Sequence, residues 1–136
     1  MNKYVHWFRW WMILGFLATN FLAVPGIFWP AAVVDVIGVT PPVEPVWPAF
    51  GFLLSFLVSW FYMPAAFQPL GNLPTAWIAV FGRFLTCGFW FFLYPCFQPG
   101  PVPCLAYVDL ILGSIQLVLL VLAVRTPSIP VSSTGA

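Results

Sequence analysis

Apolar residues form four long runs along the chain, each interrupted only by isolated polar positions. The runs cover about residues 7–24, 47–63, 75–97 and 105–124. Each is close to the roughly 20 residues that an α-helix needs to cross the hydrocarbon core of a bilayer, at a rise of about 1.5 Å per residue. The pattern predicts an all-α fold, in which residues 1–126 form a single domain of four transmembrane helices.

Prolines divide the first run from the second. Pro25 should kink or end the first helix, because it lacks an N–H donor and its ring clashes with the preceding turn. The connection Gly26–Pro48 holds five further prolines and cannot be one continuous helix. Within this proline-rich outer loop, Ala31–Val39 can form a short helix in the membrane interface, with Asp35 turned to water.

Breakers also separate the later runs. The segment Pro64–Pro74 combines proline with Gln68, Gly71 and Asn72, which predicts a turn. Pro95 should distort the last turn of the third helix. The tail 127–136 is rich in proline, serine and threonine, and we predict that it is mobile.

Small residues recur at a spacing of four, which places them on one face of a helix. Such faces let helices approach closely, either within the bundle or between copies of the chain. Trp60 and Tyr62, which follow the second of these stripes, would mark the far interface of their span. The predicted packing residues are Gly15, Thr19 and Ala23 in the first span, Gly51, Ser55 and Ser59 in the second, and Gly113 in the fourth.

The fourth run carries a polar stripe. Asp109, Gly113 and Gln116 lie at spacings of four and three, so they share one helical face with Ala106. An ionisable side chain is costly against lipid, so this face should point to protein or to water.

Counting residues from the helix ends places the other polar side chains. Arg83 and Asp109 would differ in depth by roughly 15 Å, which argues against a direct salt bridge. We therefore predict two polar centres. One joins Arg83 to Gln116 or to the Gln68–Asn72 turn, and the other joins Asp109 to Asn20 and to Tyr94 or Tyr107.

Each charged residue has two interpretations. Asp109 can cap a neighbour or bind water near the membrane boundary, or it can serve as a coupling carboxylate for protons or a cationic ligand. Arg83 can tie its helix to the inner turn, or it can bind an anionic lipid headgroup.

The composition also indicates that lipid rather than water surrounds the chain. The 136 residues are 62% hydrophobic, 20% aromatic and only 5% charged, against about 25% charged in soluble domains. So few charges cannot cover a water-soluble globule, and a bilayer must surround the chain. A net charge of +1 without a basic run excludes the electrostatic footprint of a nucleic-acid binder.

The few basic residues suggest an orientation. Lys3 and Arg9 flank the first span and Arg125 follows the last. The positive-inside rule then places both termini in the cytoplasm, for a multi-pass protein of the plasma membrane.

Cys96 and Cys104 would bracket the outer turn between the third and fourth helices. There they can form a disulfide or remain two free thiols packed as small apolar groups.

Catalytic and cofactor chemistry finds little support. The one histidine, His6, lies at the membrane edge, and we expect an interfacial side chain rather than a metal or pigment ligand. No metal-ligand spacing, phosphate loop, nucleophile set or Cys-x-x-Cys motif occurs in the sequence. We expect no catalysis, no metal and no dedicated cofactor. The aromatic coat of the third helix can contact lipid, a bound quinone or carotenoid, or another subunit.

In size and helix count the chain is similar to the small four-helix multidrug transporters, but Asn20 is the polar group of its first span, where those proteins carry an essential glutamate. The likeness is architectural only. Our first interpretation is a non-catalytic accessory or scaffolding subunit of a larger membrane complex, such as a respiratory or photosynthetic one. The second is a small homo-oligomeric transporter, or a binder of hydrophobic ligands such as lipid or quinone, that uses Asp109 and Arg83. The third, membrane-embedded thiol chemistry through Cys96 and Cys104, lacks a paired motif.

Overall fold

The protein is a multi-pass membrane protein built from α-helices. The computed structural model describes residues 2–39, 44, 46–97 and 100–126, and these residues contain no strand. Four helical stretches are long and apolar enough to cross a membrane, which confirms the predicted bundle of four spans. They are Lys3–Phe28, Val46–Phe67, Leu73–Phe97 and Cys104–Arg125. The predicted mobile tail, 127–136, lies outside the described residues.

The first span and the loop helix follow the proline pattern. Helix α1 (Lys3–Phe28) ends three residues beyond Pro25, and α2 (Pro30–Val36) follows after Trp29. Asp35 on α2 is exposed, as predicted. Gly38 ends the turn with a φ of 79°, where the Val39 amide donates to the Val34 carbonyl at 3.0 Å. This is a Schellman C-cap, and it stops α2 before the predicted end at residue 39.

The second span is broken near its end. Helix α3 (Val46–Ser59) is separated from α4 (Tyr62–Phe67) by a two-residue turn. Pro64 lies inside the first turn of α4, where its missing N–H would have no helical partner in any case. The prediction of a turn from Pro64 onward is therefore wrong for its first residues, and the connection begins only at Gln68.

The third span changes its winding. Helix α5 (Leu73–Gly88) passes into a π-helical turn, η1 (Phe89–Leu93), and then into the short α6 (Tyr94–Phe97). Pro95 cannot donate to the carbonyl four residues earlier, and its ring would clash there, so a wider turn relieves the crowding. The distortion predicted from Pro95 is confirmed, but it lies mainly in the turn before the proline. Helix α7 (Cys104–Arg125) is the fourth span.

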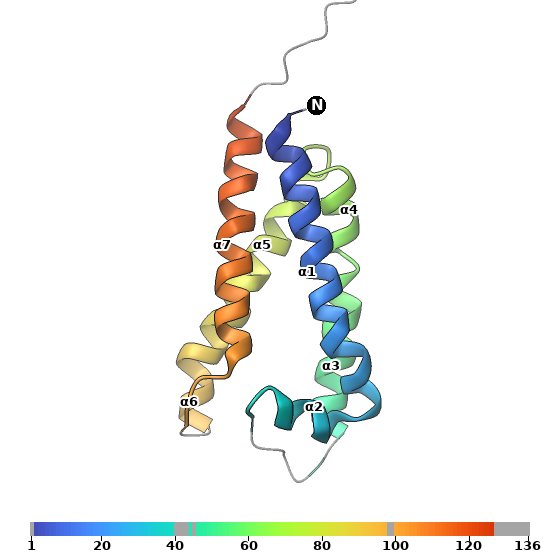
Figure 1. Ribbon diagram of the computed structural model, residues 1–136, viewed down its shortest axis with the longest axis vertical. Helices are drawn as coiled ribbons and strands as arrows, with labels where there is room; N and C mark the ends of the chain where they lie inside the picture. Colours follow the sequence, from blue (N-terminus) through green and yellow to red (C-terminus); the bar gives the residue numbers. More distant parts are fainter. Residues whose placement is uncertain (1, 40–43, 45, 98–99, 127–136) are drawn as a thin grey trace, which may run out of the picture.

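Helix α1 is the centre of the bundle. It packs against α3, α4 and α7, while α5 packs against α4 and α7. Both ends of the described chain lie at the same end of the bundle (Figure 1). There the Asn2 side-chain oxygen accepts from the Tyr4 amide, while its amide nitrogen donates to the carbonyls of Ala123 and Thr126 at 3.2 and 3.0 Å. One side chain thus caps α1 and holds the last turn of α7 beside it.

The bundle has two unlike halves. In the terminal half, which carries residue 2 and the end of α7, α1, α4, α5 and α7 enclose a closed core. Its fully buried side chains include Phe8, Met12, Val80 and Leu120. In the distal half, which carries α2 and α6, the pair α1–α3 diverges from the pair α5–α7 (Figure 1).

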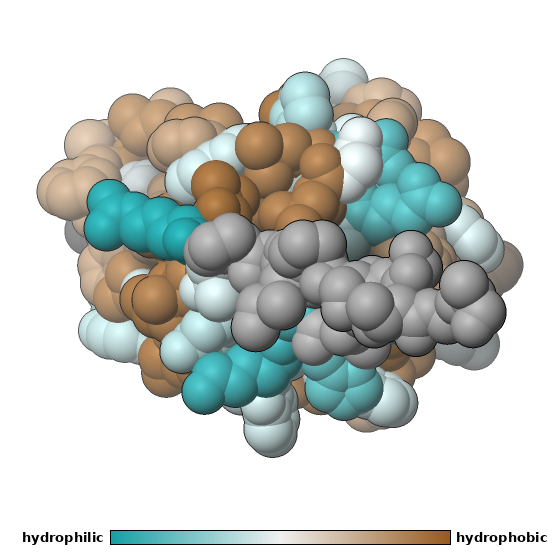
Figure 2. Space-filling model, turned by 90° about the horizontal axis from the view of Figure 1, so that it is seen from above, coloured by the Kyte–Doolittle hydropathy of each residue, from teal (hydrophilic) through white to brown (hydrophobic). Residues whose placement is uncertain are grey.

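Polar groups gather at the terminal end. Viewed onto that end, hydrophilic surface appears in patches between apolar atoms (Figure 2). Arg9 joins α1 to α4 at this end, since its guanidinium donates to the carbonyls of Ala66 and Phe67 at the end of α4, at 3.2 and 3.0 Å. These bonds satisfy carbonyls that a helix leaves unpaired at its C-terminus.

Candidate functional site

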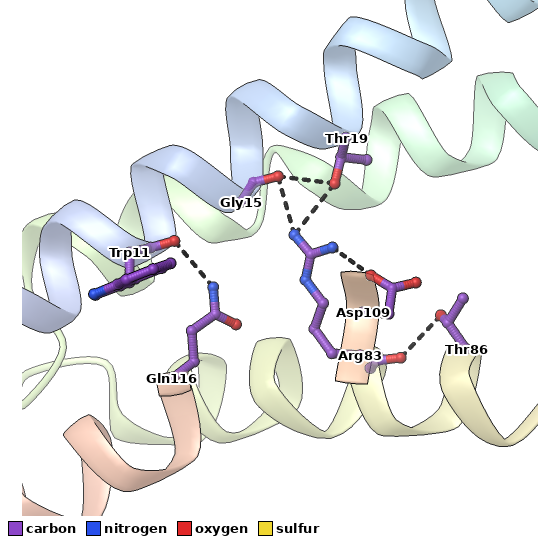
Figure 3. A network of polar contacts seen from close by, with 8 residues as sticks. Trp11, Gly15, Thr19, Arg83, Thr86, Asp109 and Gln116 are labelled. Atoms are coloured by element: carbon purple, nitrogen blue, oxygen red, sulfur yellow. Dashed lines mark hydrogen bonds and ion pairs between the residues drawn. The ribbon is translucent and has the colours of Figure 1, made fainter. Parts of the chain in front are cut away.

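Arg83 and Asp109 form a buried ion pair at the junction of the two halves. Nη1 of Arg83 lies 2.6 Å from Oδ1 of Asp109, and the two residues are 6% and 4% exposed. The prediction that depth keeps them apart is therefore wrong, and so is the prediction of two separate polar centres. Figure 3 shows the guanidinium between α1 and α7, with the carboxylate at its tip.

The reason is the relative height of the last two spans. A Cβ on Gly113 would lie 3.1 Å from the Cβ of Arg83, so α5 and α7 touch at these two residues. Arg83 is about 21 Å from the end of α6, whereas Gly113 is about 14 Å from the start of α7, at 1.5 Å per residue. Helix α7 therefore begins about 7 Å deeper than α6 ends. The long side chain of Arg83 then covers the remaining turn to Asp109.

Helix α1 completes the surroundings of the guanidinium. Nη2 of Arg83 donates to the Gly15 carbonyl at 3.0 Å and to the Thr19 hydroxyl at 3.3 Å. This approach requires glycine at position 15, because a Cβ there would lie only 2.7 Å from that nitrogen. On the other side, the guanidinium carbon lies 5.1 Å from the centroid of the Tyr62 ring, a cation–π contact. Arg83 therefore joins its own helix, α5, to α1, α4 and α7.

Tyr62 was not expected in this position. The sequence pattern places it at a membrane interface with Trp60, but Tyr62 is only 8% exposed, whereas Trp60 is 53% exposed. Residues two apart point about 200° apart around a helix, whereas Tyr62 comes three residues after Ser59, which is also buried, and so lies on the same inward face. The signal available in the sequence was this spacing of three from Ser59, the last residue of the small-residue stripe.

The amides take partners other than the predicted ones. Nε2 of Gln116 donates to the Trp11 carbonyl at 3.1 Å, so Gln116 ties α7 to α1 rather than to Arg83 (Figure 3). Asn20 donates to the Ser59 hydroxyl at 2.9 Å and to the carbonyl one turn earlier in α1, and it joins α1 to α3 rather than to Asp109. Tyr107 is 51% exposed, and its ring makes an edge-to-face contact with Phe91 instead.

The polar network is incomplete. Nε of Arg83, Oε1 of Gln116 and Oδ1 of Asn20 are buried without a hydrogen-bond partner. Asp109 uses Oδ1 for Arg83, and within the described residues Oδ2 has no partner. Unlike the three atoms above, Oδ2 of Asp109 is not among the fully buried unpartnered atoms, and Asp109 lines a cavity, so this charged acceptor is open to a donor from the cavity.

Two adjoining cavities open beside the ion pair. The first, of about 460 Å³, is lined by Asp109, Arg83, Thr19 and Tyr62 together with apolar side chains. The second, of about 730 Å³, lies towards α2 and α6 and is lined by aromatic rings that include Trp47, Phe89, Trp90, Tyr94 and Phe97. Both share the side chains of Ile37, Phe52, Ser55, Thr86 and Leu105. The two cavities adjoin through these side chains, and we call them together the cleft.

The cleft opens sideways. Leu54 and Val58 on α3 and Val108 on α7 line it, and these three side chains are 46%, 55% and 44% exposed. All three lie within the spans, so the mouth of the cleft faces the level of the acyl chains. Each cavity falls in the range of roughly 300–1,000 Å³ that is usual for small-molecule sites.

The predicted packing residues divide into two groups. Gly15, Ala23 and Gly113 are buried and Thr19 is half-buried, so these residues of the first and fourth spans lie between helices. In the second span only Ser59 is buried. Gly51 and Ser55 are exposed and line the cleft, so close packing of this part of the stripe within the bundle is wrong. At this level the pair α1–α3 diverges from the pair α5–α7 and leaves the Gly51–Ser55 part of the stripe unpartnered.

In the described part of the chain, the cysteines form no disulfide and the side chains that could bind a metal are not grouped into a site. Cys96 and Cys104 are both free and exposed, so they are neither joined in a disulfide nor packed as small apolar groups, and Cys87 is a buried free thiol. Within residues 2–39, 44, 46–97 and 100–126, no three His, Cys, Asp or Glu side chains are grouped to hold a metal ion. Comparisons with protein-family models, curated proteins and solved structures found no match to this chain.

Proposed function

We propose that this small membrane protein binds one amphiphilic molecule in the cleft, with no catalytic role of its own. The polar head would lie at Arg83 and Asp109, and the apolar part would extend along the aromatic side chains of the second cavity. This choice favours the ligand-binding interpretation of the sequence over the scaffolding one. The observation that carries it is the open acceptor of a buried ion pair at the closed end of a laterally open cleft.

The shape of the cleft supports this class of ligand. A soluble metabolite would need an aqueous entrance, whereas here exposed apolar side chains on α3 and α7 surround the mouth within the membrane. The lining is polar at one end and aromatic at the other, which matches a lipid or a quinone rather than an ion. The arrangement would hold a molecule already dissolved in the bilayer.

Filling the cleft tests the proposal. Ser55 lies where the two cavities meet, and Ser55→Phe would place an aromatic ring in the shared space. Ser114→Phe is the matched control, because Ser114 is exposed on α7 and lines neither cavity. Mild detergent extraction and native mass spectrometry should find a retained amphiphile on the wild type and on Ser114→Phe but not on Ser55→Phe. Equal retention by both variants would contradict the proposal.

An accessory role in a larger complex is the second candidate. The observation that favours it is the unpartnered Gly51–Ser55 surface of α3, where nothing lies within 4 Å of a Cβ built on Gly51. A helix of another subunit, or of a second copy, could approach there. In the same native mass experiment, foreign subunits that co-migrate with the chain would support the accessory role, and a homo-oligomer would support self-association.

The orientation is part of the proposal. Lys3, Arg9 and Arg125 all lie at the terminal end of the bundle, and we propose that this end faces the cytoplasm of a cell whose plasma membrane holds the protein. A reporter that is active only in the cytoplasm should then be active when it is fused after residue 136. A reporter that is active only on the opposite side of the membrane should be inactive there.

A further inference from the structure

We propose that the cleft selects an uncharged amphiphile whose head donates a hydrogen bond, such as the hydroxyl of a diacylglycerol, and that it rejects anionic lipids. This inference rests on the proposed function and names the class of ligand. It concerns which charge and which hydrogen-bonding character the head must have.

The first argument is the charge already present. Arg83 is the only basic side chain lining the cleft in the described residues, and Asp109 is the only acidic one. They are 2.6 Å apart, so the pair is neutral as a unit. An anionic head would bring a second negative charge beside Asp109, and a cationic head would bring a second positive charge beside Arg83. Either would remain uncompensated in a region of low dielectric, which is costly.

The second argument is the direction of the missing hydrogen bond. Both terminal nitrogens of Arg83 are engaged, Nη1 with Asp109 and Nη2 with Gly15 and Thr19. These bonds use three of the five N–H groups of the guanidinium, and Nε, which has no partner, is fully buried. Oδ2 of Asp109, by contrast, is an acceptor without a partner among the described residues, and Asp109 lines the first cavity. An ionised carboxylate oxygen requires a donor, so the head must offer an O–H or N–H.

The third argument is the neighbouring hydroxyls. Thr19 donates to the Gly15 carbonyl at 2.9 Å, Ser55 to the Gly51 carbonyl at 2.9 Å and Thr86 to the Gly82 carbonyl at 3.0 Å. All three line the cleft, and each has its proton committed to its own helix. They therefore present acceptor lone pairs rather than donors. These three hydroxyls add acceptors to the wall of the cleft beside Asp109, which favours a head group that donates over a phosphate or carboxylate that only accepts.

A matched set of lipids tests the inference on the unaltered full-length protein. The probes are dioleoylglycerol, its methyl ether without the hydroxyl proton, and dioleoylphosphatidic acid, all with the same acyl chains. Native mass spectrometry in one detergent should show dioleoylglycerol binding about tenfold or more tightly than the other two, as expected for a hydrogen bond to a charged group. Equal binding of the ether, or tighter binding of phosphatidic acid, would overturn the inference.

A substitution should invert the selectivity. Asp109→Asn removes the negative charge and leaves Arg83 uncompensated beside the cleft, so phosphatidic acid should become the preferred probe. Asp35→Asn is the matched control, because Asp35 is exposed on α2 and lines neither cavity. A folded Asp109→Asn that still prefers dioleoylglycerol would contradict the inference. If this variant does not fold, the three-lipid series on the wild type decides alone.

The inference and the proposed function fail in different ways. If none of the three probes binds, but the purified protein retains another amphiphile that Ser55→Phe removes, the head-group assignment is wrong and the cleft remains a binding site. If no amphiphile is retained or bound by any form of the protein, both are wrong.

Discussion

The terminal and distal halves of this bundle are made from the same four spans, yet one is closed and the other is open. In the terminal half, large side chains such as Phe8 and Leu120 fit between the small Ala65, Ala66 and Ala76. In the distal half the π turn and α2 replace regular packed helix, and the helix pairs diverge. Arg83 and Asp109 lie where the two halves meet.

The difference shows what holds helices together when lipid is the solvent. Acyl chains are as apolar as leucine, so burying apolar surface between helices provides little driving force. Close packing and interhelical hydrogen bonds must do so instead. The terminal half has both, through its core and the side chains of Asn2, Arg9 and Gln116. In the distal half the Asn20–Ser59 bond joins α1 to α3, while the pair α1–α3 diverges from the pair α5–α7.

The largest effect should come from removing one charge of the junction. Arg83→Ala leaves Asp109 buried without its partner, and we expect the free energy of unfolding to fall by about 3–5 kcal/mol. SDS titration in mixed micelles, followed by circular dichroism, measures it. The double variant Arg83→Met with Asp109→Leu removes both charges and should lose much less. A double variant as unstable as the single one would contradict the view that uncompensated charge is the main cost.

The next effect compares the two halves directly. Leu120→Ala removes packing from the closed core, where Leu120 is fully buried. In a bilayer the water-transfer part of the usual cost is absent, so we expect a loss of about 2 kcal/mol from the cavity alone. Leu105→Ala, which only widens the cleft, should change stability by less than about 0.5 kcal/mol. Equal losses in the same SDS titration would show that the distal half is closed in the membrane.

A smaller effect should follow from the close approach of α5 and α7. Gly113→Ala places a Cβ 3.1 Å from the Cβ of Arg83 and should cost about 1.5 kcal/mol by overpacking. Gly82→Ala on α5 is the control, since nothing lies within 4 Å of its added Cβ. That variant should be neutral or gain up to about 1 kcal/mol from helix propensity. The reverse order of the two variants would place the helix contact elsewhere.

The smallest effect concerns the terminal end. Asn2→Ala removes the cap of α1 and two bonds to the last turn of α7, and we expect a loss of about 1 kcal/mol. Hydrogen exchange should show faster exchange of the first amides of α1, with the distal half unchanged. Ser114→Ala on the exposed face of α7 is the control and should leave both quantities unaltered.

Much of the fold could be predicted because it follows from local patterns. The fourth span was predicted at 105–124 and is found at Cys104–Arg125, since an apolar run in lipid has no other way to satisfy its backbone. The inward face of that span was also correct, because Ala106, Asp109, Gly113 and Gln116 are all buried. The first span is longer than predicted at both ends, because Asn2 caps it and one more turn follows Pro25.

The candidate site could be predicted only as a list of residues. Asp109 and Arg83 were identified as buried polar groups, but their pairing depends on how deep α7 begins relative to α6, and residue counting assumes equal levels. Tyr62 was placed at an interface because it is aromatic, although its spacing of three from Ser59 puts both side chains on one buried face. The cleft lies between segments far apart in the chain and has no local signature.

The amino-acid sequence alone determined that this chain is a membrane protein, that it has four membrane-spanning helices and which face of its last helix turns inward. These follow from helical periodicity and from the cost of unpaired polar groups in hydrocarbon. Only the tertiary structure decided that Arg83 meets Asp109 and that a cleft opens beside them. Heights, tilts and gaps between helices arise from packing across the whole bundle, where side chains from all four spans meet.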